Sequence, residues 1–213
     1  MLDDLRLEGL GLPVVTARLV LRRFVPADFA AFADWHRRAE VYRYLYQPPP
    51  EPEAVRAKFA AALQGPFASD GDELRLAVTP RQGGSALGQV KLRIASRAAL
   101  QGEIGYIFHP DAGGRGYATE AVAALLDFGF AECGFHRLFA RLDPENRGSV
   151  GVVERLGLRC EAHFRQNDRF AGRWGDEMVY AVLRGEWEER RARAAVPSIS
   201  PPLSSPRKRG PIS

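Results

Sequence analysis

The chain has 213 residues, of which 46% are apolar, so it can bury a sizeable core and is not a disordered protein as a whole. No run of about 18 apolar residues is present, which excludes a membrane-spanning helix. Cys133 and Cys160 are the only cysteines and form no Cys-x-x-Cys pair, so we expect no disulfide framework, no metal site and a reduced, cytoplasmic compartment.

The net charge of +4 is a property of the C-terminal end. Five of the 30 basic residues and none of the 26 acidic residues lie from Arg191 onward, which leaves residues 1–190 at about −1. We therefore predict one domain over residues 1–190 and a basic, disordered tail rich in Pro and Ser over residues 191–213. Nucleic acid is an unlikely partner for the near-neutral domain, although a basic tail leaves a contact with RNA open.

The first part of the chain predicts a strand followed by two helices. Residues 17–24 approach strand alternation, and Pro26 then begins a helix. A stretch of aromatic residues ends in three prolines, Pro48 to Pro50, which forbid regular structure there. A second helix is expected over residues 52–63, where Gln-Gly-Pro ends it.

The remainder alternates between strands and helices. We expect strands at residues 73–79, 87–94, 103–109, 136–142, 158–165 and 177–183, and helices at residues 117–131 and 149–156. The early strands form hairpins, and β-α-β connections follow in the middle of the chain. This order predicts an α/β (α+β) domain with a mixed sheet.

Residues 103–121 carry the most informative pattern, a strand, a glycine-rich turn and a helix. Glycines allow close approach of the backbone to a ligand, and the helix start offers unpaired N–H groups to a phosphate, although such turns also occur for packing reasons. A mononucleotide P-loop would need Gly-Lys-Ser/Thr where this chain has Gly116-Tyr117-Ala118. A dinucleotide fingerprint would need glycine where Thr119 stands.

Residues 109–121 resemble the pyrophosphate-binding turn of the GNAT superfamily of N-acetyltransferases. Further segments are similar in order and spacing: residues 146–149 and 153–158 resemble the superfamily's next segment, and residues 16–24 and 174–180 resemble its ribosomal-protein N-terminal (RimJ/RimL-type) branch. The resemblance covers roughly residues 14–188.

The resemblance implies a central twisted mixed sheet flanked by helices. It also implies acetyl-CoA as co-substrate and acetyl transfer to a primary amine, on a protein N-terminus or a small molecule, by direct attack and without a metal. The alternative is a module of the same fold that binds acyl-CoA without catalysis. The pattern leaves the oligomeric state open, as monomer or dimer.

The resemblance also assigns the residues that bind the co-substrate. Backbone groups of the turn would hold the pyrophosphate, with the side chain of Arg115 adding a contact; these residues are Gly113, Gly114, Arg115, Gly116, Tyr117 and Ala118. Ile107 and Phe108 would pair with the pantetheine arm, and Asn146 would contact its amide. The family usually has Gln or Arg where this chain has Gly113, so we expect one contact to be missing.

Catalysis needs a base, because a typical amine is largely protonated near pH 7. Glu103 is the candidate base and His109 its rival, while Ser149 would protonate the leaving thiolate. Ser149 has an alternative role as the N-cap of the following helix. For the acceptor wall the resemblance indicates residues 42–50, with Tyr44 and Tyr46, and Trp174 farther along the chain.

Overall fold

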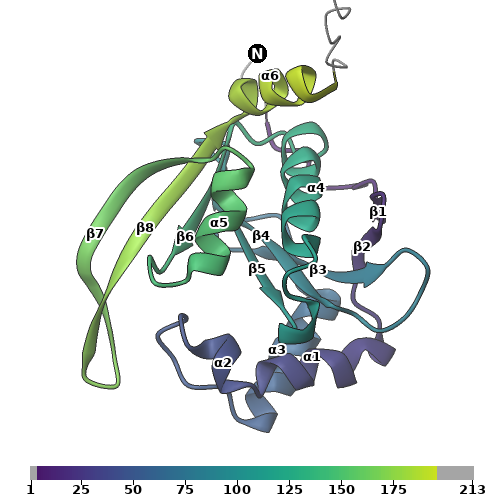
Figure 1. Cartoon of the computed structure of the whole chain (residues 1–213). Helices are drawn as coiled ribbons and strands as arrows, with labels where there is room; N and C mark the ends of the chain where they lie inside the picture. Colours follow the sequence, from purple (N-terminus) through teal and green to yellow (C-terminus); the bar gives the residue numbers. More distant parts are fainter. Residues whose placement is uncertain (1–3, 196–213) are drawn as a thin grey trace, which may run out of the picture.

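The computed structural model describes residues 4–195, and its centre is one sheet of eight strands in the order β1-β2-β3-β4-β5-β6-β8-β7 (Figure 1). All neighbouring strands are antiparallel except β5 and β6. The strands are β1 (Val14–Val15), β2 (Leu19–Arg23), β3 (Glu73–Pro80), β4 (Gly88–Ser96), β5 (Gln101–Phe108), β6 (Arg137–Leu142), β7 (Arg159–Phe170) and β8 (Arg173–Leu183). The predicted mixed sheet is confirmed.

The described residues contain six α-helices, most of which pack against this sheet: α1 (Phe29–His36), α2 (Ala39–Tyr42), α3 (Pro52–Gln64), α4 (Tyr117–Ala131), α5 (Arg147–Arg155) and α6 (Arg184–Ala195). The larger apolar core lies between the sheet and α4, with α5 beside it. A second, smaller core forms where α1 and α3 pack on the opposite face, around Phe32, Trp35 and Phe59. The two faces of the sheet therefore differ in how much of each is buried. The larger core lies on one face, and the smaller core covers only part of the other.

The parallel strands β5 and β6 separate halfway along their length. They pair only from Gln101 with Arg137 to Glu103 with Phe139. Beyond that point β5 stays paired with β4 as far as Phe108, while β6 stays paired with β8 as far as Leu142. The side of β5 that faces β6 is thus left with a free backbone edge after Glu103.

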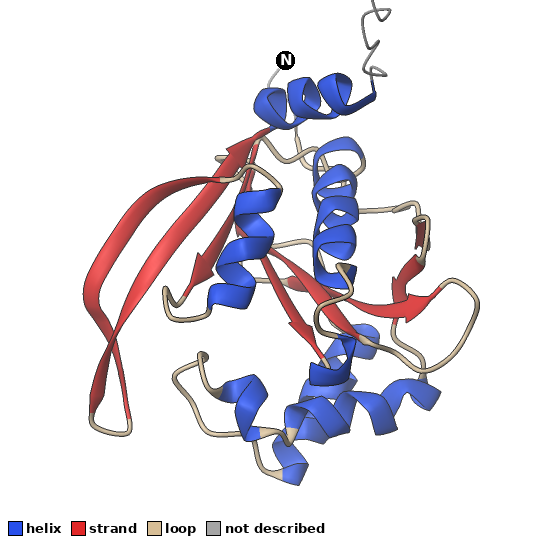
Figure 2. Cartoon of the chain, in the orientation of Figure 1, coloured by secondary structure: helices blue, strands red, loops and turns tan. Residues whose placement is uncertain are grey.

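The helix predicted over residues 117–131 has these bounds in the structure. The short helix α2 was not predicted. The last two strands are longer than expected and form a hairpin that projects beyond the sheet (Figure 2). The boundary predicted at residue 190 falls within α6, which continues to Ala195, and Trp187 anchors this helix by donating to Asp127 Oδ1 at 2.8 Å.

The disorder predicted for the tail concerns residues that, from 196 onward, lie outside the described part of the chain. Among the helices that the structure describes, none is long and apolar enough to cross a membrane.

Candidate active site

The glycine-rich turn leads from the end of β5 into α4. His109 begins it by accepting the Asp111 N–H at Nδ1, at 3.1 Å, which closes the 3-10 turn Pro110–Ala112. Gly114 and Gly116 then take φ angles of +72° and +74°, a region that side chains rarely adopt. A Cβ at Gly114 would meet nothing within 4 Å, so its backbone borders open space.

The missing Gln or Arg at Gly113 has a local explanation. Gly113 is extended, with φ of −63°, a conformation that any residue adopts. However, a Cβ there would lie 2.9 Å from the carbonyl oxygen of Pro110, which already accepts the Gly113 N–H. The tight 3-10 turn therefore leaves no room for a side chain at this position.

The first turn of α4 is held in place by the β1–β2 connection. Gly116 is the N-cap residue and has no side chain, so the N–H groups of the first turn stay available to an anion. The Glu120 carboxylate accepts from Thr16 Oγ1 at 2.6 Å and from Arg18 Nε at 2.6 Å. Burial raises the pKa of Glu120, but these hydrogen bonds lower it by more than burial raises it, so its pKa lies below the ordinary value.

One cleft of about 980 Å³ joins this turn to the free edge of β5 and to α2. It is lined by most of the residues that the sequence indicated: Tyr44, Glu103, Ile107, Phe108, Gly113, Gly114, Gly116, Tyr117, Ala118, Asn146 and Ser149. Residues assigned to co-substrate, catalysis and acceptor thus meet in a single cavity.

Three predicted site residues do not line this cleft. Arg115 borders a smaller depression of about 430 Å³ beside α1, and its carbonyl accepts from Arg18 Nη1 at 2.9 Å. The Tyr46 hydroxyl is engaged with Asp143 Oδ2 at 2.6 Å, so it ties the α2 segment to the end of β6. Trp174 lies on the projecting hairpin, 59% exposed, beneath the guanidinium of Arg169. These three side chains thus lie outside the lining of the cleft, and their roles in binding stay predictions.

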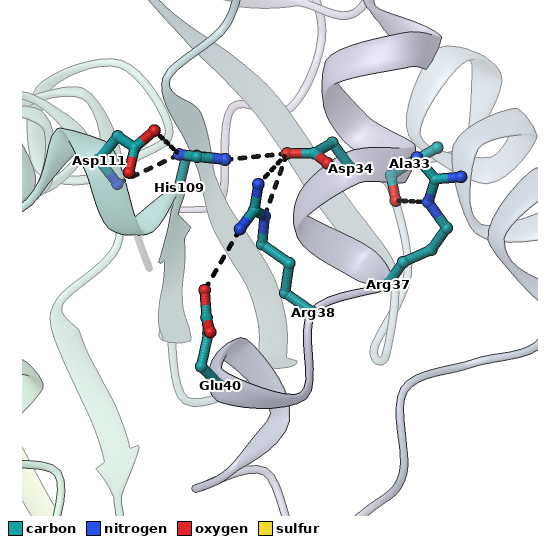
Figure 3. A network of polar contacts seen from close by, with 7 residues as sticks. All are labelled: Ala33, Asp34, Arg37, Arg38, Glu40, His109 and Asp111. Atoms are coloured by element: carbon teal, nitrogen blue, oxygen red, sulfur yellow. Dashed lines mark hydrogen bonds and ion pairs between the residues drawn. The ribbon is translucent and has the colours of Figure 1, made fainter.

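Glu103 and His109 differ in how they are engaged. Glu103 lies on the floor of the cleft, 18% exposed, with Arg93 Nη1 at 3.4 Å from Oε2. His109 uses both ring nitrogens, since Nδ1 accepts from Asp111 and Nε2 lies 2.8 Å from Asp34 Oδ2 (Figure 3). Arg38 also bonds Asp34, so His109 belongs to a structural network at the base of the turn.

Asn146, and not Ser149, caps the N-terminus of α5. Asn146 is the N-cap residue of α5, and its Oδ1 accepts the Ser149 N–H at 3.1 Å. Ser149 sits inside the first turn, so its alternative role as the N-cap was wrong. Tyr106, which the sequence analysis did not single out, donates its hydroxyl to the Ser149 carbonyl at 2.8 Å. This bond fixes the start of α5 against β5, with Ser149 lining the cleft.

The far end of the cleft contains polar residues that the sequence analysis missed: His36, Lys58, Arg75, Gln89 and Lys91. Alternation along β3 was the available signal, because buried Leu74 and Leu76 flank Arg75 and place it on the opposite face. His36 and Lys58 had no comparable signal, since their helices approach the sheet only through tertiary packing.

His36 and Tyr42 form a buried pair at this end. His36 Nδ1 lies 2.5 Å from the Tyr42 hydroxyl. Burial, together with the charges of Lys58 and Arg75, lowers the pKa of His36 to about 4, so the imidazole is neutral at pH 7. Burial raises the pKa of Tyr42 to about 12, so the phenol keeps its proton.

A splayed parallel strand pair beside a glycine turn and a free helix N-terminus can hold a phosphate group and an extended chain next to it. Residues 18–159 match the family model of the acetyltransferase (GNAT) domain, and the chain belongs to this family. GNAT acetyltransferases use acetyl-CoA as co-substrate, and the turn and the open strand edge fit that molecule. Within residues 4–195, no group of three or more His, Cys, Asp or Glu side chains is placed to hold a metal.

Individual relatives agree with this assignment. The uncharacterized N-acetyltransferase YnaD of Bacillus subtilis is 31% identical over 175 residues, which are 82% of this chain and 98% of that protein. A GNAT-family acetyltransferase from Bacillus anthracis has a TM-score of 0.72 at 27% identity, over 82% of this chain and 100% of its own. A Vibrio cholerae spermidine N-acetyltransferase, solved with CoA and spermine, shares the fold, with a TM-score of 0.72 at 20% identity over 81% and 99% of the two chains.

Proposed function

We propose that this N-acetyltransferase moves the acetyl group of acetyl-CoA directly onto a primary amine, of a protein N-terminus or of a small molecule, with Glu103 as base and Ser149 as proton donor. The observation that carries the proposal is the single cleft, which brings the glycine turn, the free edge of β5, Glu103 and Ser149 together.

The donor end binds through the backbone. The first-turn N–H groups of α4 and the turn at Gly114 and Gly116 would hold the pyrophosphate. The unpaired edge of β5 at Ile107 and Phe108 would bond the pantetheine amides as an additional strand does. An N–H at this edge would also stabilise the oxyanion that forms on the thioester carbonyl.

At the acceptor end, Glu103 takes a proton from the amine, directly or through a water molecule. Its partial exposure supports this role, and so does the engagement of both ring nitrogens of His109. The neutral amine nitrogen bonds to the carbonyl carbon, the carbon–sulfur bond breaks, and the nitrogen loses its second proton to solvent. Ser149 protonates the thiolate, and the proton held by Glu103 returns to Ser149 through solvent.

Calorimetry with purified protein tests the donor half of the proposal. We expect micromolar binding of acetyl-CoA and none of ATP, since the turn lacks the lysine of a P-loop. Acetylation of a panel of amines, followed by mass spectrometry, tests the transfer. Failure to bind acetyl-CoA would overturn the proposed function, and binding without transfer to any amine would leave only a binding module.

A further inference from the structure

The acceptor end of the cleft has a charged floor that the transfer chemistry does not use. Strand pairing aligns Arg75, Lys91 and Gly105 in one row across β3, β4 and β5. Because side chains alternate along a strand, this row shares its face with Gln89 and Glu103. With strands about 4.8 Å apart, the backbone of Arg75 lies about 10 Å from that of Gly105. The cations of this row thus lie close enough to Glu103 to contact a second group of an acceptor whose amine is at Glu103.

The positive charges of this floor are only partly neutralised. Arg75 and Lys91 share one carboxylate, that of Glu73, which Lys91 Nζ approaches to 3.0 Å. Lys58 of α3 lines the same end, is half-buried, and has no ion pair with any residue of the described range 4–195. Three cations, Lys58, Arg75 and Lys91, therefore face the single carboxylate of Glu73, which leaves about two positive charges on this floor.

The other charged groups that line the cleft do not compensate them. Glu103 is paired with Arg93, and Glu40 with Arg38. Arg141 is paired with Glu177 at 2.7 Å. The two remaining charged groups have opposite signs. Asp143 lies at the end of β6, where it accepts the Tyr46 hydroxyl, and Arg155 lies on α5 beside the donor end.

Two buried polar atoms at the same end have no partner. His36 and Gln89 are each 2% exposed and both line the cleft, yet His36 Nε2 and Gln89 Oε1 accept or donate no hydrogen bond within residues 4–195. Buried polar atoms are nearly always satisfied, so these two atoms are available to a water molecule or to a ligand in the cleft. When the Tyr42 hydroxyl donates to Nδ1, the neutral imidazole carries its proton on Nε2, and this N–H has no acceptor among the described residues.

Resting on the proposed acetyl transfer, we propose that the acceptor is a small primary amine that also carries an anionic group, a carboxylate or a phosphate. Lys58, Arg75 and the Nε2–H of His36 hold that group. The amine then lies toward Glu103, so the two ends of the cleft orient the acceptor. A polyamine would instead place its positive charges against Lys58 and Arg75.

Pairs of acceptors that differ only in their anionic group test the charged floor in the purified protein. We would measure kcat/KM for amino acids against the corresponding amino acid amides, which keep the amine and lose the carboxylate. Aminoalkyl phosphonates, a polyamine and a short peptide with a free N-terminus complete the panel. We expect at least about a tenfold preference for the best anionic amine over its neutral analogue. The carboxylate and phosphonate arms distinguish the two anions.

Substitutions on α3 test whether Lys58 causes the preference for anionic amines. Lys58→Met should reduce the preference several-fold while the Kd for acetyl-CoA stays unchanged. Arg56→Met, on the same helix but with a 64% exposed side chain outside the cleft, is the matched control and should keep the preference.

Equal rates for the anionic and neutral amines, preference for the polyamine or the peptide, or an undiminished preference in Lys58→Met would each overturn the inference. So would acetyl-CoA binding without transfer to any anionic amine. If the wild-type protein does not bind acetyl-CoA at all, the proposed function fails instead, so the two failures are distinguishable.

Discussion

The two ends of the cleft are built from different parts of the polypeptide. At the donor end the groups proposed to bind acetyl-CoA belong to the backbone, namely the glycine turn, the first turn of α4 and the open edge of β5. At the acceptor end they are side chains from separate elements, such as His36, Lys58 and Gln89. A backbone site is insensitive to most substitutions, whereas a side-chain site changes with each one. Relatives can therefore share the donor end and differ in acceptor.

The largest effect is expected where the backbone itself is changed. Gly116→Val places a β-branched residue at a φ of +74°, which should displace the start of α4 and weaken acetyl-CoA binding by at least about 1000-fold. Calorimetry measures the Kd. Gly83→Val is the control, because Gly83 has a φ of +91° in the β3–β4 connection, outside the cleft and with nothing within 4 Å of an added Cβ. Equal loss of binding in both variants would contradict a backbone site at Gly116.

At the junction of the two ends, Glu103→Gln removes the proposed base without changing its shape. We expect kcat to fall about 100-fold while the Kd for acetyl-CoA stays constant. The rate of the variant should rise more steeply with pH than that of the wild type, because more of the amine is then neutral without help. Glu161→Gln on β7, outside the cleft, is the control. A matching pH profile in variant and wild type would argue against a base at Glu103.

A pair of substitutions in the first turn of α5 separates catalysis from capping. Ser149→Ala should lower kcat roughly tenfold, since a thiolate leaves without full protonation, and should leave stability unchanged. Asn146→Ala should instead lower the free energy of unfolding by about 1 kcal/mol, because Asn146 caps the helix. Single-turnover kinetics and denaturant titrations measure the two effects. A stability loss in Ser149→Ala larger than in Asn146→Ala would reverse the assignment.

The last effect is a loss of stability in acid, and it belongs to the acceptor end alone. The pKa of His36 is about 4 in the folded protein and near 6.5 when unfolded. Above about pH 6.5 the imidazole is neutral in both states, and His36 does not reduce stability. As the pH falls from 6.5 to about 4, the unfolded state binds a proton that the folded state does not, so the free energy of unfolding falls by up to about 3 kcal/mol. His36→Gln should flatten the acid dependence of the free energy of unfolding over that range. An unchanged slope would mean that other groups cause the acid sensitivity.

The donor end was predictable because its signals are local. Glycines at 114 and 116 followed by a helical apolar spacing from Tyr117 predicted both the turn and the bounds of α4. Even the departure at Gly113 was visible, although its cause, the carbonyl of Pro110, needed coordinates.

The acceptor end was not predictable because its residues meet only through tertiary packing. Tyr46 and Trp174 were expected beside the acceptor, yet a bond to Asp143 engages one and the projecting hairpin carries the other away. The strand β7 is exposed along nearly its whole length, so no alternation marked how far it extends. Lys58 appears in the sequence only as one cation on an amphipathic helix.

The open edge of β5 has a consequence for solubility and proteolysis. A row of unpaired strand groups usually invites a neighbouring chain to pair with it, which leads to aggregation. Here the edge borders a cleft that is also lined by residues of α5 and of the α2 segment, so it does not lie on a flat, open side of the sheet. The substrate arm that fills it would act as a ninth strand, so the enzyme should resist heat and proteases best when its donor substrate is present.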